Sequence, residues 1–149
     1  MKNKKVTIFE GQKIRRIWDD KSEKWWFSVI DIVQSLTGST ISRRYWSDLK
    51  TKLKNEGSQL YEKIVQLKFQ SNDGKQYESD AADTETIFRI IQSITSPKAE
   101  PFKLWLARVG YERIEETEDP EKAIQRALNI YLKKGYSKSW VNLRLKSIE

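Results

Sequence analysis

Short apolar segments separated by polar clusters occupy the first thirty positions of the chain. Residues 6–9 and 25–29 are rich in β-branched and aromatic residues, and residues 13–18 alternate imperfectly between polar and apolar. Glu10-Gly11-Gln12 and the polar cluster at 19–24 separate them. A period of two is typical of half-buried strands, and such clusters are typical of turns. The pattern predicts a small antiparallel β-meander.

The spacing then becomes helical. Asp31 opens a short helix over 31–36, which Thr37-Gly38-Ser39 ends, and Ser42 is the expected N-cap of a second helix that reaches about Lys54. Two short helices joined by about five residues have the spacing of a helix-turn-helix.

Residues 65–69 alternate again, and Asn72-Asp73-Gly74-Lys75 provides the turn of a hairpin that returns over 76–79. Four isoleucines at helical spacing follow a cap at Asp83 or Thr84, and further helices are expected after Ser96, Asp119 and Ser137. The predicted class is α+β: the meander and hairpin pack with helices that include a helix-turn-helix-like pair, and a C-terminal helical extension follows. The acidic stretch at 115–121 divides a domain at 1–116 from the extension at 117–149. That extension is either the end of a short protein or the start of a further C-terminal region.

The chain of 149 residues contains neither histidine nor cysteine. This excludes Cys/His zinc sites, disulfides, thiolate nucleophiles and Ser-His-Asp triads. The acidic residues between 73 and 85 could hold a divalent metal, but Asp73 has a turn role and Asp83 a capping role. Gln66-Leu67-Lys68 resembles the end of a degenerate nuclease motif, yet the nearest upstream acid, Asp48, lies on a helix. We therefore expect no catalytic residue, metal or cofactor.

Charge is distributed unevenly along the chain. Lys and Arg number 28 against 21 Asp and Glu, giving a net charge of +7. Residues 1–54 hold 13 basic and 6 acidic side chains, so this third alone carries +7. Such asymmetry favours a polyanionic partner, most commonly nucleic acid, over a protein with merely uneven surface charge. The longest uncharged run, 32–42, is polar, so we expect a cytoplasmic protein with no membrane partner.

The second helix of the pair carries the candidate contact surface. Arg43, Ser47, Lys50 and Lys54 share a sector of roughly 60° on it, beside an apolar stripe of Trp46, Leu49 and Leu53. A recognition helix needs cations for phosphates and short polar groups for base edges, although a solvated amphipathic helix gives the same pattern. The expected DNA contacts are Arg43, Arg44, Ser47, Lys50 and Lys54, flanked by Lys4, Lys5 and either Arg15 or Arg16. Adjacent strand residues face opposite ways, so one arginine of the pair joins a given surface.

Aromatic residues offer a second kind of surface. One residue of the Trp25-Trp26 pair should enter the core, and the other could stack on bases or a partner, although we favour both being packed. Trp25, or the helix bearing Trp140, would anchor a protein partner.

Longer runs of sequence indicate a particular protein family. Residues 26–33, Trp-Phe-Ser-Val-Ile-Asp-Ile-Val, preceded by the hairpin at 8–18, resemble the N-terminal domain of the BRO family of phage antirepressors. Residues 44–50, 96–102 and 105–114 are similar to the DNA-damage-inducible protein D branch of that family. The resemblance covers nearly all of residues 8–145. Other such domains often contain a histidine after the two-helix segment, and this chain has none.

The resemblance implies a DNA-binding regulatory domain of phage, prophage or bacterial origin that takes part in transcription regulation or the DNA damage response, and not an enzyme. The alternative is a protein-interaction module that binds a repressor or a DNA-repair or recombination protein. A single two-helix unit usually reads DNA as a dimer, so a homodimer is possible, although no apolar seam in the sequence shows one.

Overall fold

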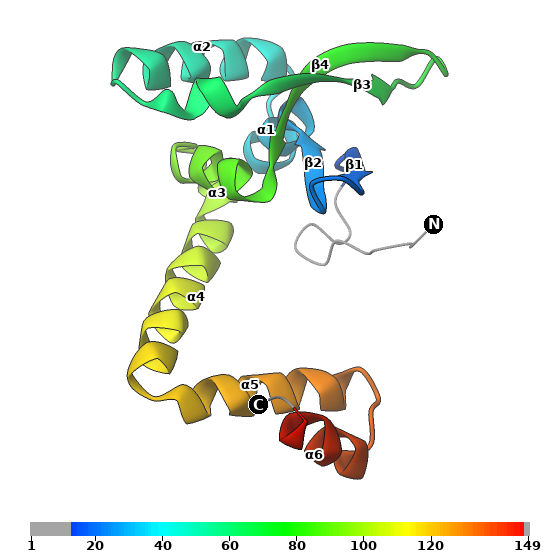
Figure 1. The fold of residues 1–149 in the computed structure, drawn as a ribbon. Coiled ribbons are helices and arrows are strands. Elements are labelled where there is room, and N and C mark those ends of the chain that lie inside the picture. Colours follow the sequence, from blue (N-terminus) through cyan, green and yellow to red (C-terminus); the bar gives the residue numbers. More distant parts are fainter. Residues whose placement is uncertain (1–12, 148–149) are drawn as a thin grey trace. The chain divides into compact units, whose positions relative to one another are not determined.

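The computed structural model describes residues 13–147, in two compact units (Figure 1). The first unit ends at Lys103 and the second begins at Leu104. The strand expected at 6–9, together with Lys4 and Lys5, lies outside the described residues.

Within residues 13–103, the first unit contains a four-stranded antiparallel sheet. Its strands are β1 (Arg16–Asp19), β2 (Lys24–Ser28), β3 (Val65–Gln70) and β4 (Gln76–Asp83), in the order β1-β2-β4-β3. The α+β class is therefore confirmed. The hairpin of β3 and β4 joins the hairpin of β1 and β2 because β4 also pairs with β2, with Trp26 opposite Asp83. Strand β4 extends four residues beyond the predicted 76–79, and Ala81 and Ala82 in this extension are fully buried.

The turn between β3 and β4 has the predicted chemistry. Gly74 adopts a left-handed conformation with φ +81°, and Asp73 accepts a 2.8 Å hydrogen bond from the backbone N–H of Lys75. An aspartate that bonds the backbone two residues ahead, followed by a glycine, is a common way to reverse a chain.

Helices α1 (Val29–Thr37) and α2 (Ser42–Asn55) form the predicted pair. The cap of α1 is Ser28, whose Oγ accepts from the N–H of Asp31, and Gly38 ends this helix with φ +66°. The expectation that Ser42 caps α2 was wrong. Ile41 occupies the N-cap position without a side-chain hydrogen bond, so Ser42 is the first helical residue. In the turn before it, Ser39 Oγ accepts from the N–H of Ile41.

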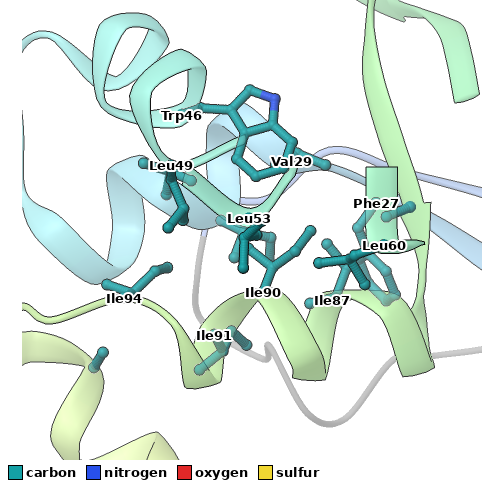
Figure 2. Close-up of a cluster of buried hydrophobic side chains, with 14 of the residues drawn as sticks. Phe27, Val29, Trp46, Leu49, Leu53, Leu60, Ile87, Ile90, Ile91 and Ile94 are labelled. Atoms are coloured by element: carbon teal, nitrogen blue, oxygen red, sulfur yellow. The ribbon is translucent and has the colours of Figure 1, made fainter. Parts of the chain in front are cut away.

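The core lies where α2 and α3 (Thr84–Gln92) meet the sheet and α1. Asp83 caps α3, as predicted, by accepting from the N–H of Thr86 at 3.0 Å. Figure 2 shows the side chains of α2 and α3 interdigitating with Phe27, Val29 and Leu60. Leu60 comes from the short 3-10 helix η1 (Gln59–Lys63). A second 3-10 helix, η2 (Pro97–Ala99), contributes the buried Ala99.

Three helices follow η2. Helix α4 (Glu100–Glu118) is continuous through most of the acidic stretch, α5 (Pro120–Lys133) begins after the predicted cap Asp119, and α6 (Lys138–Lys146) begins after the predicted cap Ser137. Within the second unit, Arg126 of α5 forms an ion pair with the buried Glu116 of α4.

Candidate nucleic-acid interface

One side of α2 fixes this helix to the rest of the first unit. Trp46, Leu49 and Leu53 are buried, with 3%, 7% and 3% of their surface exposed. They are spaced by three and four residues, so they form one stripe, as the sequence predicted. In Figure 2 the ring nitrogen of Trp46 points away from the apolar cluster, and it donates a 2.8 Å hydrogen bond to Asp80 Oδ2 on β4.

The adjoining side of α2 is exposed and mostly basic. Arg43, Arg44, Ser47 and Lys54 all reach solvent. Lys54 Nζ lies 5.4 Å from the centre of the Tyr61 ring, within the range of a cation–π contact. None of the three cations has a carboxylate within ion-pair distance among residues 13–147.

Lys50 lies at the edge of this face and is already paired. Its Nζ is 2.9 Å from Asp80 Oδ2 and 5.7 Å from the centre of the Trp46 ring. The charge of Lys50 is therefore paired with a carboxylate of the sheet. Arg43, Arg44 and Lys54 have no such partner among residues 13–147.

Asp80 is the acceptor that connects α2 to the sheet. Its carboxylate accepts from Trp46, from Lys50 and from the side-chain amide of Gln66 on β3. Burial alone would raise the pKa of Asp80, but the hydrogen bonds from Lys50 and Trp46 and the charge of Lys50 outweigh burial, and they hold this pKa below its ordinary value. The charged form is therefore the one that the fold stabilises.

The two adjacent arginines have different surroundings, although only Arg16 lies in β1. Arg15 forms a bidentate pair with Asp31 of α1, with Nε–Oδ2 and Nη2–Oδ1 distances of 2.7 and 3.0 Å. It also donates to the backbone oxygen of Gln70 at 3.2 Å, which ties α1 to the end of β3. Arg16 is exposed, and its guanidinium carbon lies 5.6 Å from the centre of the Trp25 ring.

The aromatic candidates are both part of clusters. Trp25 and Trp26 are each half-buried, so neither enters the core fully, and Trp25 packs against it. Trp25 meets Trp18 edge-on at 5.3 Å. In the second unit, Trp140 is 41% exposed and stacks on Tyr136 at 4.3 Å, with Tyr131 edge-on to both rings.

The acidic residues considered for a metal have structural partners. Asp73 binds Tyr77 Oη and the turn backbone, Asp83 caps α3 and pairs with Lys24 at 3.3 Å, and Asp80 pairs with Lys50. Over residues 13–147, no group of three or more acidic side chains gathers in a way that could hold a metal ion.

A polar cleft of about 980 Å³ opens beside the first turn of α2. It is bordered by α1, by the residues after β3 and by Lys98 of η2. The basic residues on its walls are Lys13, Arg15, Arg43 and Lys98. This cleft and the exposed face of α2 share Arg43.

Sequence reasoning missed several residues at this surface. Thr51 and Lys52 are exposed on α2 beside Ser47 and Arg44, and the helical spacing could have identified them. Lys13 and Lys98 border the cleft, and no local signal identifies Lys98 because it lies more than forty residues after α2 in the chain.

These features define an α+β domain that packs one side of the second helix of a helix-turn-helix-like pair into its core and presents the basic side to solvent. A model of the BRO family N-terminal domain matches residues 13–114, more than half of the chain. The chain therefore belongs to the BRO family, whose N-terminal domains are phage antirepressor-like DNA-binding regulators. Comparison with curated proteins and with solved structures gave no match. Among residues 13–147, no helix combines the length and apolarity needed to cross a membrane.

Proposed function

We propose that this chain regulates transcription or DNA metabolism by binding duplex DNA through the exposed face of α2. The observation that carries the proposal is the division of this helix into two sides. One side holds the helix in the core through Trp46, Leu49 and Leu53, and the other presents cations that have no ion-pair partner among residues 13–147. A helix held in this way keeps its basic side in a fixed orientation, which a groove-binding helix requires.

The residues of the exposed face have distinct roles in this proposal. Arg43, Lys52 and Lys54 contact phosphates, whereas Arg44, Ser47 and Thr51 lie nearer the middle of the face, where base edges would be read. Lys50 acts chiefly by fixing the rotation of α2, because its charge is paired with Asp80. Arg15 likewise fixes α1 through Asp31, which leaves Arg16 as the flanking phosphate contact.

A salt titration tests this function. Duplex DNA is titrated with the full chain by fluorescence anisotropy at several salt concentrations, and four phosphate contacts give a log–log slope of about −3.6. R43A/R44A removes one phosphate contact and one base contact, so the slope should fall in magnitude by about 0.9 and the affinity should drop further. The matched control K133A/K134A removes two exposed cations from the end of α5. A salt-independent wild type, or equal losses in both double variants, would contradict the proposal.

A second candidate function rests on the aromatic cluster of the second unit. Tyr131, Tyr136 and Trp140 form a connected group, and Leu143 nearby on α6 is 69% exposed. Exposed aromatic residues are common anchors of protein interfaces. In this second function the chain binds a repressor or a DNA-repair protein through the cluster. Trp25 is the corresponding anchor in the first unit.

Nuclease-treated host extract separates the two functions. A repressor or recombination protein that is retained by the wild type and lost with W140A favours the second, and one that is retained only before nuclease treatment favours the first. The control L104A truncates another exposed apolar residue of the second unit, which is 63% exposed. Sedimentation of the free chain and of its DNA complex tests the homodimer.

A further inference from the structure

We propose that the cleft beside the first turn of α2 binds a DNA backbone phosphate through Lys13, Arg43 and Lys98. This inference rests on the proposed DNA-binding function and adds a site to it. The site lies next to the exposed face of α2, and two of its three cations come from outside the two-helix unit.

The charges on the cleft walls do not cancel. Among residues 13–147, four cations border the cleft, against a single carboxylate, that of Asp31. Asp31 is already bound by Arg15 in a bidentate pair, so these two charges offset each other. Lys13, Arg43 and Lys98 have no carboxylate within ion-pair distance in the part of the chain that the structure describes. Three such cations around one polar hollow favour an anion.

The remaining wall residues suit a phosphodiester. Gln34, Ser35, Ser71 and Asn72 supply amide and hydroxyl groups around the cleft. Groups of these kinds, together with Lys and Arg, make most protein contacts to phosphate oxygens. Because Arg43 belongs both to the cleft and to the face of α2, a strand that follows this face passes the cleft. That continuity favours a backbone phosphate of DNA over a free nucleotide.

The side chain of Lys98 lies close to Gly38, which ends α1. A Cβ built on Gly38 would lie 2.6 Å from Lys98 Nζ, so the ammonium lies directly against the turn between α1 and α2. The last turn of α1 has no basic residue of its own, and the free carbonyls of a helix end attract a cation. Lys98 is therefore positioned at the cleft although it comes from η2.

A stabilising role at the end of α1 is the competing explanation for Lys98, and a charge-preserving variant separates the two. The test compares wild type, K13A/K98A, K13R/K98R and the control K133A/K134A by DNA titration at several salt concentrations, with thermal unfolding of each. We expect K13A/K98A to lower the magnitude of the salt slope by about one, since the cleft neutralises a single phosphate. K13R/K98R should keep the slope, and the control should match the wild type.

The outcomes distinguish this inference from the proposed function. If R43A/R44A weakens binding while K13A/K98A keeps the wild-type slope, the cleft proposal is wrong and α2 recognition stands. A lower unfolding temperature in K13A/K98A with an unchanged slope assigns Lys98 to stability and overturns the cleft. If the wild type shows no salt-dependent binding, both proposals fail. Deoxynucleoside monophosphate is the last probe: saturable binding that blocks DNA would make the site a free-nucleotide site and overturn the DNA assignment.

Discussion

The indole nitrogen of Trp46 and Lys50 Nζ both bind the same oxygen of Asp80, at 2.8 and 2.9 Å. The two donors lie one helical turn apart, so one carboxylate of β4 sets both the position of α2 and its rotation about its own axis. The direction in which the exposed face points therefore depends on a strand residue that is not part of that face.

Replacing Asp80 should destabilise the first unit. D80N removes the charge that Lys50 and Trp46 share, and hydrogen bonds to a charged group contribute about 1.5–3 kcal/mol, a figure reduced here because Lys50 is partly exposed. We expect a loss of about 1–2 kcal/mol in urea-induced unfolding. E78Q, an exposed carboxylate on the same strand, is the control. Equal midpoints for the two variants would contradict the role of Asp80.

The same substitution should change the pH dependence of stability. The pKa of Asp80 is lowered in the folded state, so its contribution is present above the ordinary carboxylate pKa of about 4 and is lost as the pH falls through the lower folded-state pKa. The difference between wild type and D80N should be largest near neutral pH and shrink below about pH 4. Unfolding curves at a series of pH values measure it, and a constant difference across the series would refute this prediction.

Substitutions at Lys50 and Lys54 should affect different properties, namely stability for Lys50 and DNA binding for Lys54. K50M breaks the pair with Asp80 and should lower the unfolding midpoint while leaving the DNA salt slope nearly unchanged. K54M removes an unpaired cation of the exposed face, so it should leave the midpoint unchanged and reduce the slope by about one. Both quantities are measured for both variants, and the reverse pattern would show that Lys50 is the DNA contact.

The isoleucine core of α3 should be sensitive to truncation. Ile90 is fully buried among residues of α2 and the sheet (Figure 2). I90A should cost about 2–5 kcal/mol, because it removes buried methyl groups and leaves a cavity. I114A, at a position that is 64% exposed, should change stability by less than about 0.5 kcal/mol. Chemical unfolding of both variants tests the contrast, which disappears if Ile90 is not part of a packed core.

Gly38 and Gly57 have similar backbone conformations, but substitution by alanine should affect DNA binding only at Gly38. Gly38 and Gly57 have φ +66° and +80°, so alanine at either position costs about 1 kcal/mol in strain. The Cβ of G38A also meets Lys98 Nζ, whereas nothing lies within 4 Å at Gly57. Since the end of a lysine side chain can move, we expect similar unfolding midpoints but weaker DNA binding in G38A alone. Binding losses of the same size in both variants would count against the cleft.

Local sequence signals predicted the elements well. The start of α3 followed from the capping residue Asp83, the β3–β4 turn from Asp73 and Gly74, and the buried stripe of α2 from the spacing of its apolar residues. Each depends on residues within a few positions of one another, so the pattern alone carries the information. The start of α2 was misplaced by one residue because Ile41 occupies the N-cap position and makes no side-chain hydrogen bond, so no capping residue marks it in the sequence.

The parts that sequence did not predict depend on contacts between distant segments. Pairing of β2 with β4 joins residues more than fifty positions apart, and the pair of Lys50 with Asp80 spans thirty. Lys98 reaches the α1–α2 turn only through the path of the chain after α3. Nothing in the periodicity of a single helix distinguishes a cation that will be paired from one that will remain free.

The side chains that pack α2 into the domain and those that it exposes to solvent are different sets. The exposed set can therefore be changed without disturbing the packing. Substitutions at Arg44, Ser47 and Thr51 alter the displayed side and leave the Trp46, Leu49 and Asp80 contacts in place. A lineage can therefore acquire a new operator, or a designer a new target, by exchanging a few surface positions on an unchanged scaffold.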